Sequence, residues 1–125
     1  DLHRVAMEYP NVNFVIPHFG TGFFREVLML GDLVENVYLD TSSSNSWIKY
    51  LVPETTLDAV FQKALEVYGH RRLLFGTDSS FFPRGWNHSV FDTQTAVLNS
   101  LGVEEAAVRA ILGGNLTRLM EGLQT

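Results

Sequence analysis

The segment from Leu73 to Ser80 constrains the fold of this chain most, because it has the pattern of a buried strand that ends in an acid. The apolar or small residues 73–76 run directly into Thr77 and Asp78, and apolar residues with helical spacing precede them. A strand led in by a helix and followed by a loop is typical of a parallel sheet. Binding and catalytic groups collect at the carboxyl ends of such strands, so Asp78 is a candidate site residue.

Two other segments follow the same pattern, with a short apolar run that ends in polar residues. Strands are predicted over about residues 13–17, 36–40 and 72–77. The first leads into His18, and the second ends at Asp40. Because the carboxyl ends of parallel strands share one edge of a sheet, we expect a histidine and two aspartates to lie close together there.

Amphipathic helices alternate with these strands. The clearest covers about residues 54–68, where apolar positions recur with the helical period and Gly69 follows as a C-cap. The alternation predicts an α/β fold of three parallel βα units. The chain has 125 residues, whereas a closed (β/α)₈ barrel takes about 250, so we expect one open domain over residues 1–125. Further helices are predicted over about 1–9, 90–101 and 104–112, after Gly22, and up to Met120.

Composition excludes several classes of function. The formal net charge is −5 and no basic run is longer than residues 70–72, which argues against nucleic acid as a partner. No apolar run approaches the roughly 20 residues needed to cross a bilayer. The chain has no cysteine, which rules out disulfides, thiolate metal ligands and cysteine nucleophiles. It also suits a reducing compartment, so we expect a cytoplasmic protein.

Four short motifs cover nearly the whole chain. They are YPNVNFVIPHFG at 9–20, NVYLDTS at 36–42, RLLFGTD at 72–78 and ILGGNLTRLM at 111–120. In this order and spacing they resemble the amidohydrolase-related metal-dependent hydrolases, in particular the branch of aminocarboxymuconate-semialdehyde decarboxylase and related decarboxylases and lactone hydrolases. In that family the motifs lie on barrel strands six, seven and eight and on the closing helix. The resemblance therefore implies a partial TIM barrel.

The resemblance also implies roles for two residues. Asp78 matches the strand-eight aspartate that binds the catalytic metal, and His18 matches the strand-six histidine that faces the metal-bound water. It further implies a divalent metal cofactor, most often zinc, and a hydrolase or decarboxylase (lyase) that acts on a small molecule. From the residues alone, Asp78 could equally bind backbone N–H groups of the following loop, and His18 could be satisfied by the backbone.

The chain departs from this family in its other metal ligands. The family has a His-x-His pair on its first strand and another histidine on its fifth, whereas the histidines here are isolated, at positions 3, 18, 70 and 88. We therefore expect the C-terminal part of such a barrel, inactive alone, with the metal absent or weakly bound. The alternative is a non-catalytic half-barrel that forms a homodimer or docks to a missing N-terminal half, because its sheet has two free edges.

The loop 79–89 contains the candidate substrate-binding residues. Arg84 could pair with a substrate carboxylate, and Trp86 and His88 could form a pocket wall, although a solvated loop explains them equally well. Residues 40–42 could orient a ligand, but we expect them mainly to satisfy the loop backbone.

Three further assignments are structural. We expect Phe23 and Phe24 to face the core or an interface, and Asn115 to cap the last helix. Residues 70–72 follow a helix C-terminus, where cations are favoured by the helix dipole, and they receive no catalytic role.

Overall fold

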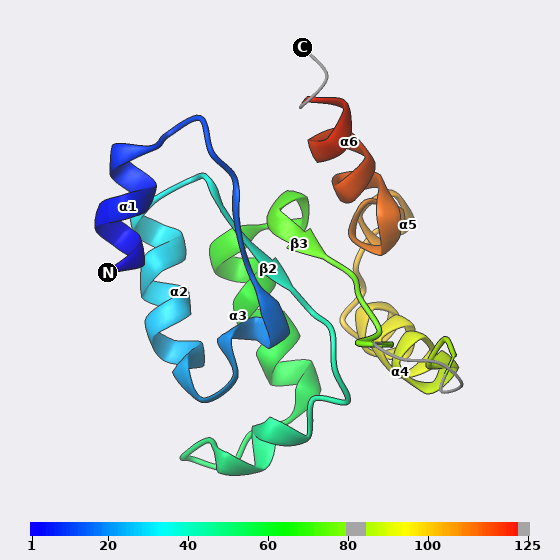
Figure 1. Cartoon of the computed structure of the whole chain (residues 1–125). Helices are drawn as coiled ribbons and strands as arrows, with labels where there is room; N and C mark the ends of the chain where they lie inside the picture. Colours follow the sequence, from blue (N-terminus) through cyan, green and yellow to red (C-terminus); the bar gives the residue numbers. More distant parts are fainter. Residues whose placement is uncertain (80–84, 123–125) are drawn as a thin grey trace.

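The computed structural model describes residues 1–79 and 85–122 and contains a three-stranded parallel sheet (Figure 1). The strands lie in the spatial order β1-β2-β3, which confirms the predicted α/β class. The described residues form an open sheet like part of a barrel. The strands are β1 (Phe14–Ile16), β2 (Val37–Asp40) and β3 (Leu73–Leu74).

Helices follow each strand and cover the sheet. α2 and α3 lie beside it, while α4, α5 and α6 form a column on the far side of β3 (Figure 1). No helix in the described ranges is long and apolar enough to span a bilayer. The helices are α1 (Leu2–Glu8), α2 (Phe24–Leu33), α3 (Leu57–Tyr68), α4 (His88–Ser100), α5 (Glu105–Arg109) and α6 (Asn115–Glu121), with short turns η1 (Pro17–Phe23), η2 (Ser46–Tyr50) and η3 (His70–Arg72) and a π-helical segment η4 (Ala110–Gly114).

The main core lies on the helix-covered face of the sheet. Val37 and Leu39 of β2 are fully buried and belong to the same apolar cluster as Phe61 of α3. The residues that alternate with them on β2 are only half-buried, as expected when one face of a strand is less covered than the other. Val15, at the centre of edge strand β1, is 49% exposed. One face and one edge of the sheet are therefore partly open.

Helix α3 shows why the sequence pattern was informative. The Thr56 side chain accepts a hydrogen bond from the Ala59 backbone N–H at 3.2 Å and so caps the first turn. Its apolar positions face the core, and Gly69 ends the helix with a φ of 64°. The helix covers Leu57–Tyr68, close to the predicted range.

Arg72, just before β3, joins two helix ends. Its guanidinium donates to the carbonyl oxygens of Gly31 and Val34, at the end of α2, and of Val67, near the end of α3. Its Nε donates to the Tyr68 carbonyl at 3.1 Å. Last-turn carbonyls lack intrahelical partners, and a cation suits the negative end of the helix dipole. The structural role predicted for residues 70–72 is therefore performed by Arg72, which binds the carbonyls at the ends of α2 and α3.

Three local predictions differ from the structure in part or in full. Phe24 reaches the core as expected, whereas Phe23 is 70% exposed because the turn before α2 ends there, so for Phe23 only the interface stays as a prediction. Asn115 does not cap α6 but is its first residue, and its buried side chain donates to the carbonyls of His70 and Leu73. The predicted helix 104–112 changes at Ala110 from α-helical to π-helical geometry.

Candidate functional site at the carboxyl ends of the strands

The loops that follow the three strands contain every non-glycine residue with a positive φ in the described part of the chain. This backbone conformation is uncommon for residues with a side chain, and it concentrates at functional sites. The common edge formed by these loops is therefore the candidate site. The residues are His18, Phe19 and Thr21 after β1, Ser43 and Asn45 after β2, and Asp78 after β3.

His18 is held by residues at the end of β2. Its Nδ1 atom lies 2.8 Å from Ser42 Oγ, and the Ser42 backbone N–H donates to Asp40 Oδ1 at 2.5 Å. Ser42 is only 4% exposed, whereas the imidazole is half-buried. A ligand could therefore reach the ring but not the hydroxyl. We call His18, Ser42 and Asp40 the His18 cluster.

The segment after β3 meets this cluster through Gly76. A Cβ atom added to Gly76 would lie 2.9 Å from Ser42 Cβ and 3.2 Å from Asp40 Oδ1. Any side chain would therefore push the two segments apart, so glycine permits the close approach. Gly76 brings the third strand end, two residues before Asp78, against the His18 cluster.

Phe19 fixes the backbone next to His18. Its side chain is fully buried, and its ring centroid lies 5.0 Å from that of Phe61, 6.2 Å from that of Phe24 and 6.4 Å from that of Trp47. These edge and tilted contacts anchor the loop in the core, as buried aromatic pairs do. The left-handed conformation of His18 is thus maintained by the packing of its neighbour.

Thr41 ties the end of β2 to helix α4. Its hydroxyl donates to Gln94 Oε1 at 2.6 Å, and Gln94 Nε2 donates back to the Thr41 carbonyl at 2.6 Å. Both residues are almost completely buried, so each group depends on the other. Beside this pair lies a hollow of about 80 Å³ that hydroxyl groups line from both elements. Its lining residues are Ser43, Ser44, Asn45, Leu57, Ser89, Val90, Thr93 and Gln94.

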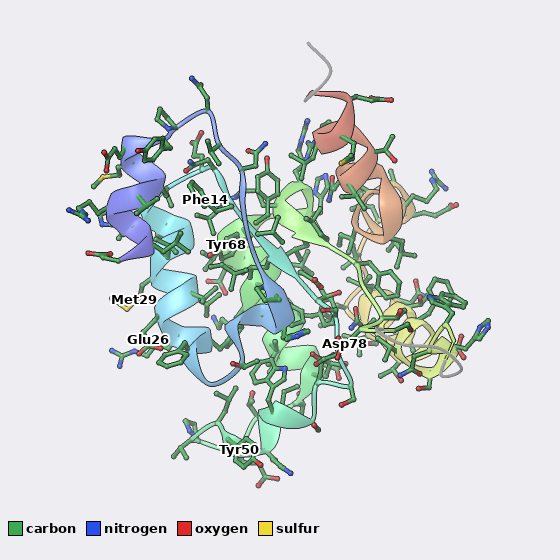
Figure 2. The ribbon with its side chains drawn as sticks, viewed as in Figure 1. Phe14, Glu26, Met29, Tyr50, Tyr68 and Asp78 are labelled. Atoms are coloured by element: carbon green, nitrogen blue, oxygen red, sulfur yellow. The ribbon has the colours of Figure 1, made fainter. Side chains whose placement is uncertain are left out.

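Asp78 is exposed and left-handed, and it lies at the same end of the sheet as the loops after β1 and β2 (Figure 2). Its carboxylate has no hydrogen bond to any residue of 1–79 or 85–122. The loop is instead closed by Ser79, whose hydroxyl pairs with Thr77 Oγ1 at 2.8 Å and accepts from the Asn87 N–H at 2.9 Å. The capping role considered for Asp78 therefore belongs to Ser79 in the part of the loop that is described.

The described residues do not complete a metal site. Within 1–79 and 85–122 there is no group of three or more His, Asp or Glu side chains that could hold an ion. Catalytic zinc usually takes three protein ligands and a water molecule. Asp78 can supply one ligand at most, so these residues alone do not fit a zinc centre.

Two of the predicted substrate-binding residues lie together. The rings of Trp86 and His88 have centroids 4.1 Å apart, and Trp86 also lies 5.5 Å from Phe91 of α4. Phe91 in turn packs on Phe75, just after β3, at 5.8 Å. Among the described residues, no hydrogen bond or ring contact connects these aromatic residues to the His18 cluster. Arg84 lies outside the described residues.

Sequence reasoning missed the parts of the site that depend on long-range packing. Ser42 was expected to satisfy loop backbone, yet its side chain holds His18. The sequence pattern places Gly76 in a strand and gives no sign of its contact with Ser42, and it assigns no role to Gln94. One signal was present for Gln94, since it is an amide on the apolar face of a predicted helix, and such a residue needs a buried polar partner.

Comparison with known proteins places the chain in a family. The amidohydrolase family model matches residues 1–120. Protein fluG of Emericella nidulans is 32% identical over 82 residues, which are 66% of this chain and 9% of fluG. The chain belongs to the amidohydrolase family.

The fold agrees with this assignment. An amidohydrolase from Burkholderia multivorans, crystallised with bound zinc, superposes with a TM-score of 0.70 at 16% identity. A second crystal form, with bound HEPES, superposes with a TM-score of 0.68 at 17% identity. Both matches cover 94% of this chain, but only 46% and 47% of the solved chains. The chain therefore spans less than half the length of the solved structures it matches.

Proposed function

We propose that this chain supplies part of the active site of a metal-dependent hydrolase or decarboxylase. The observation that carries the proposal is the convergence of three strand ends at the His18 cluster, where Ser42 Oγ lies 2.8 Å from His18 Nδ1 and Gly76 brings in the segment that ends at Asp78. In (β/α) barrels catalytic groups lie at this end of the strands. Family membership supports a hydrolase-type reaction.

Each residue has a proposed task. Asp78 is one ligand of a divalent metal ion, zinc being favoured, and residues outside the 125 of this chain supply the others. When bound, such an ion acts as a Lewis acid that activates water. His18 binds the substrate or holds a proton through Nε2, the ring nitrogen that has no partner among the described residues. Trp86, His88 and Arg84 are proposed to contact the substrate.

The motifs that contain His18 and Asp78 favour the branch of the family that contains aminocarboxymuconate-semialdehyde decarboxylase. Both hydrolysis and decarboxylation fit these residues. A cytoplasmic location is also proposed, because a chain without cysteine suits a reducing compartment.

A second proposal is a non-catalytic half-barrel. It is favoured by the partly open sheet, with Val15 at the centre of a free edge strand and 49% exposed. Unpaired strand edges invite another chain. The occupant proposed here is a second copy of this chain, or the remaining half of a barrel.

One experiment separates the two proposals. The purified chain is incubated with zinc and with panels of amides, lactones and small carboxylic acids, alone and after co-expression with the first half of a barrel from the similar Burkholderia amidohydrolase. Turnover in either sample that His18→Ala abolishes supports the enzymatic proposal. His70→Ala is the matched control, because that side chain is exposed at the opposite end of β3. A stable assembly without turnover supports the half-barrel.

A further inference from the structure

The contact between Ser42 and His18 determines which imidazole nitrogen carries the proton. Ser42 Oγ and His18 Nδ1 are 2.8 Å apart, a distance that fits a hydroxyl–imidazole hydrogen bond in either direction. A neutral imidazole has one N–H and one acceptor nitrogen. The direction of this one bond therefore decides the chemistry of Nε2 on the other side of the ring.

Accounting for the hydroxyl hydrogen selects one direction. Ser42 is 4% exposed, and His18 Nδ1 is the sole polar atom hydrogen-bonded to its Oγ among residues 1–79 and 85–122. If Nδ1–H donated to Ser42, the buried hydroxyl hydrogen would have no acceptor, which is costly. If the hydroxyl donates to Nδ1, both groups are satisfied. The ring hydrogen then resides on Nε2.

We infer that Ser42 is a positioning residue that fixes neutral His18 in the Nε2–H tautomer. Neutral His18 then presents a hydrogen-bond donor to the site and not a base. This suits a ligand whose oxygen accepts a hydrogen bond, such as the carbonyl of an amide or lactone or a carboxylate. The inference rests on the proposed function for the role of that donor, but the tautomer itself is a property of the chain alone.

The surroundings of Ser42 strengthen the assignment. Its backbone N–H is held by Asp40 Oδ1 at 2.5 Å, and Gly76 packs directly against its Cβ. The serine is therefore fixed in place by its backbone and by a neighbouring strand end. The imidazole of His18 is held as well, because buried Phe19 anchors the loop that carries it. The Ser42 hydroxyl and His18 Nδ1 are therefore both fixed within hydrogen-bonding distance.

Nitrogen NMR of the whole chain tests the tautomer directly. Long-range ¹H–¹⁵N spectra of ¹⁵N-histidine-labelled protein, recorded at a pH where the imidazole of His18 is neutral, distinguish pyrrole-type from pyridine-type ring nitrogens. We expect a pyridine-type Nδ1 and a pyrrole-type Nε2 for His18. The reverse pattern overturns the inference, whether or not the chain has activity. Loss of the proposed activity with the expected tautomer would instead contradict only the proposed function.

Substitution tests the part played by Ser42. In Ser42→Ala the preference for the Nε2–H tautomer should fall by roughly fivefold, the equilibrium equivalent of one ordinary hydrogen bond. Ser44→Ala is the matched control, because this exposed serine lies in the same loop, and it should leave the His18 shifts unchanged. An unchanged tautomer ratio in Ser42→Ala overturns the positioning role. If that variant does not fold, the spectrum of the unsubstituted chain still decides the tautomer.

Discussion

The ring of Tyr68 occupies the space where any other residue at Gly31 would place its side chain. A Cβ atom added to Gly31 would lie 2.5 Å from Tyr68 Cε2 and 2.6 Å from Cζ. The Tyr68 hydroxyl also donates to the Val27 carbonyl at 2.6 Å. The close approach of α2 and α3 therefore depends on a glycine in one helix and an aromatic ring in the other.

Replacing Gly31 with alanine should destabilise the protein. Alanine favours a helix over glycine by about 1 kcal/mol, but overpacking a core typically costs about 1–3 kcal/mol. The contact at 2.5 Å is with a ring held at both ends, by the core and by its hydroxyl, so we expect overpacking to prevail. Denaturant unfolding should show a lower midpoint for Gly31→Ala. Gly22→Ala is the control, since nothing lies within 4 Å of its added Cβ; equal midpoints for both variants would contradict the prediction.

Tyr68 should make stability fall at alkaline pH. Burial raises the pKa of Tyr68 to about 12 from 10.0, although the charge of Arg72 opposes this. The unfolded chain therefore releases this proton from about pH 10, while the folded chain holds it until about pH 12. The contribution is fully present below pH 10 and is lost as pH rises through this window, by roughly 2–3 kcal/mol. Tyr68→Phe should show a flatter dependence of the unfolding free energy over the same range. An identical slope in both proteins would refute the assignment.

The pair of Thr41 and Gln94 should contribute strongly to stability. Gln94→Met keeps the volume but leaves the buried hydroxyl and carbonyl of Thr41 without partners. Each such group costs about 1–3 kcal/mol, so we expect a loss of about 3 kcal/mol in the free energy of unfolding. Thr93→Ala, an exposed neighbour on α4, should change it by less than about 0.5 kcal/mol. Comparable losses in both would show that the pair is not responsible.

The chain alone should bind a divalent ion weakly or not at all. Asp78 offers at most one ligand, and the described residues contain no cluster that could complete a site. We expect well under one zinc ion per chain after dialysis, with no difference between the unsubstituted chain and Asp78→Ala. One ion per chain that survives dialysis and disappears in Asp78→Ala would mean that further ligands come from another copy or from residues outside the described ranges.

The purified chain should form a dimer through the free edge of its sheet. Cyclic twofold symmetry is the commonest arrangement, and a specific interface should exceed roughly 1,000 Å². A charged residue at the centre of an edge strand opposes pairing, so Val15→Lys should give monomers in sedimentation velocity. Val12→Lys is the control, because Val12 is equally exposed but lies before β1. A monomeric, cooperatively folded protein at micromolar concentration would contradict the dimer.

Sequence patterns predicted those parts of the fold in which local and tertiary preferences agree. α3 has a cap at Thr56, a regular apolar face and a terminal Gly69, and it forms nearly where expected. The three strands are also where the apolar runs lie, although β3 pairs over only two residues. The Thr41 N–H still bonds to the Leu74 carbonyl, and the N–H of the next residue, Phe75, bonds to the Ile111 carbonyl of η4.

The rest depended on contacts between residues far apart in the sequence. Asparagine is a common helix cap, but the Asn115 side-chain amide donates to carbonyls more than 40 residues earlier in the sequence. Phe23 and Phe24 are equivalent in sequence, and only the turn before α2 decides which one is buried. The hydroxyl of Ser42 has no local signal at all, because its partner is set by the pairing of β1 with β2.

Arg72 determines where this chain could be divided in two. Its guanidinium donates to the carbonyls of residues 31 and 34 as well as to those of 67 and 68. These hydrogen bonds connect an early part of the sequence to a late one. A break at Val52, which is 95% exposed, would leave Arg72 on the second piece and the carbonyls of residues 31 and 34 on the first. The two pieces could then reassemble through the hydrogen bonds between these groups. A break between Gly69 and Arg72 would instead separate Arg72 from α3, whose last carbonyls it binds.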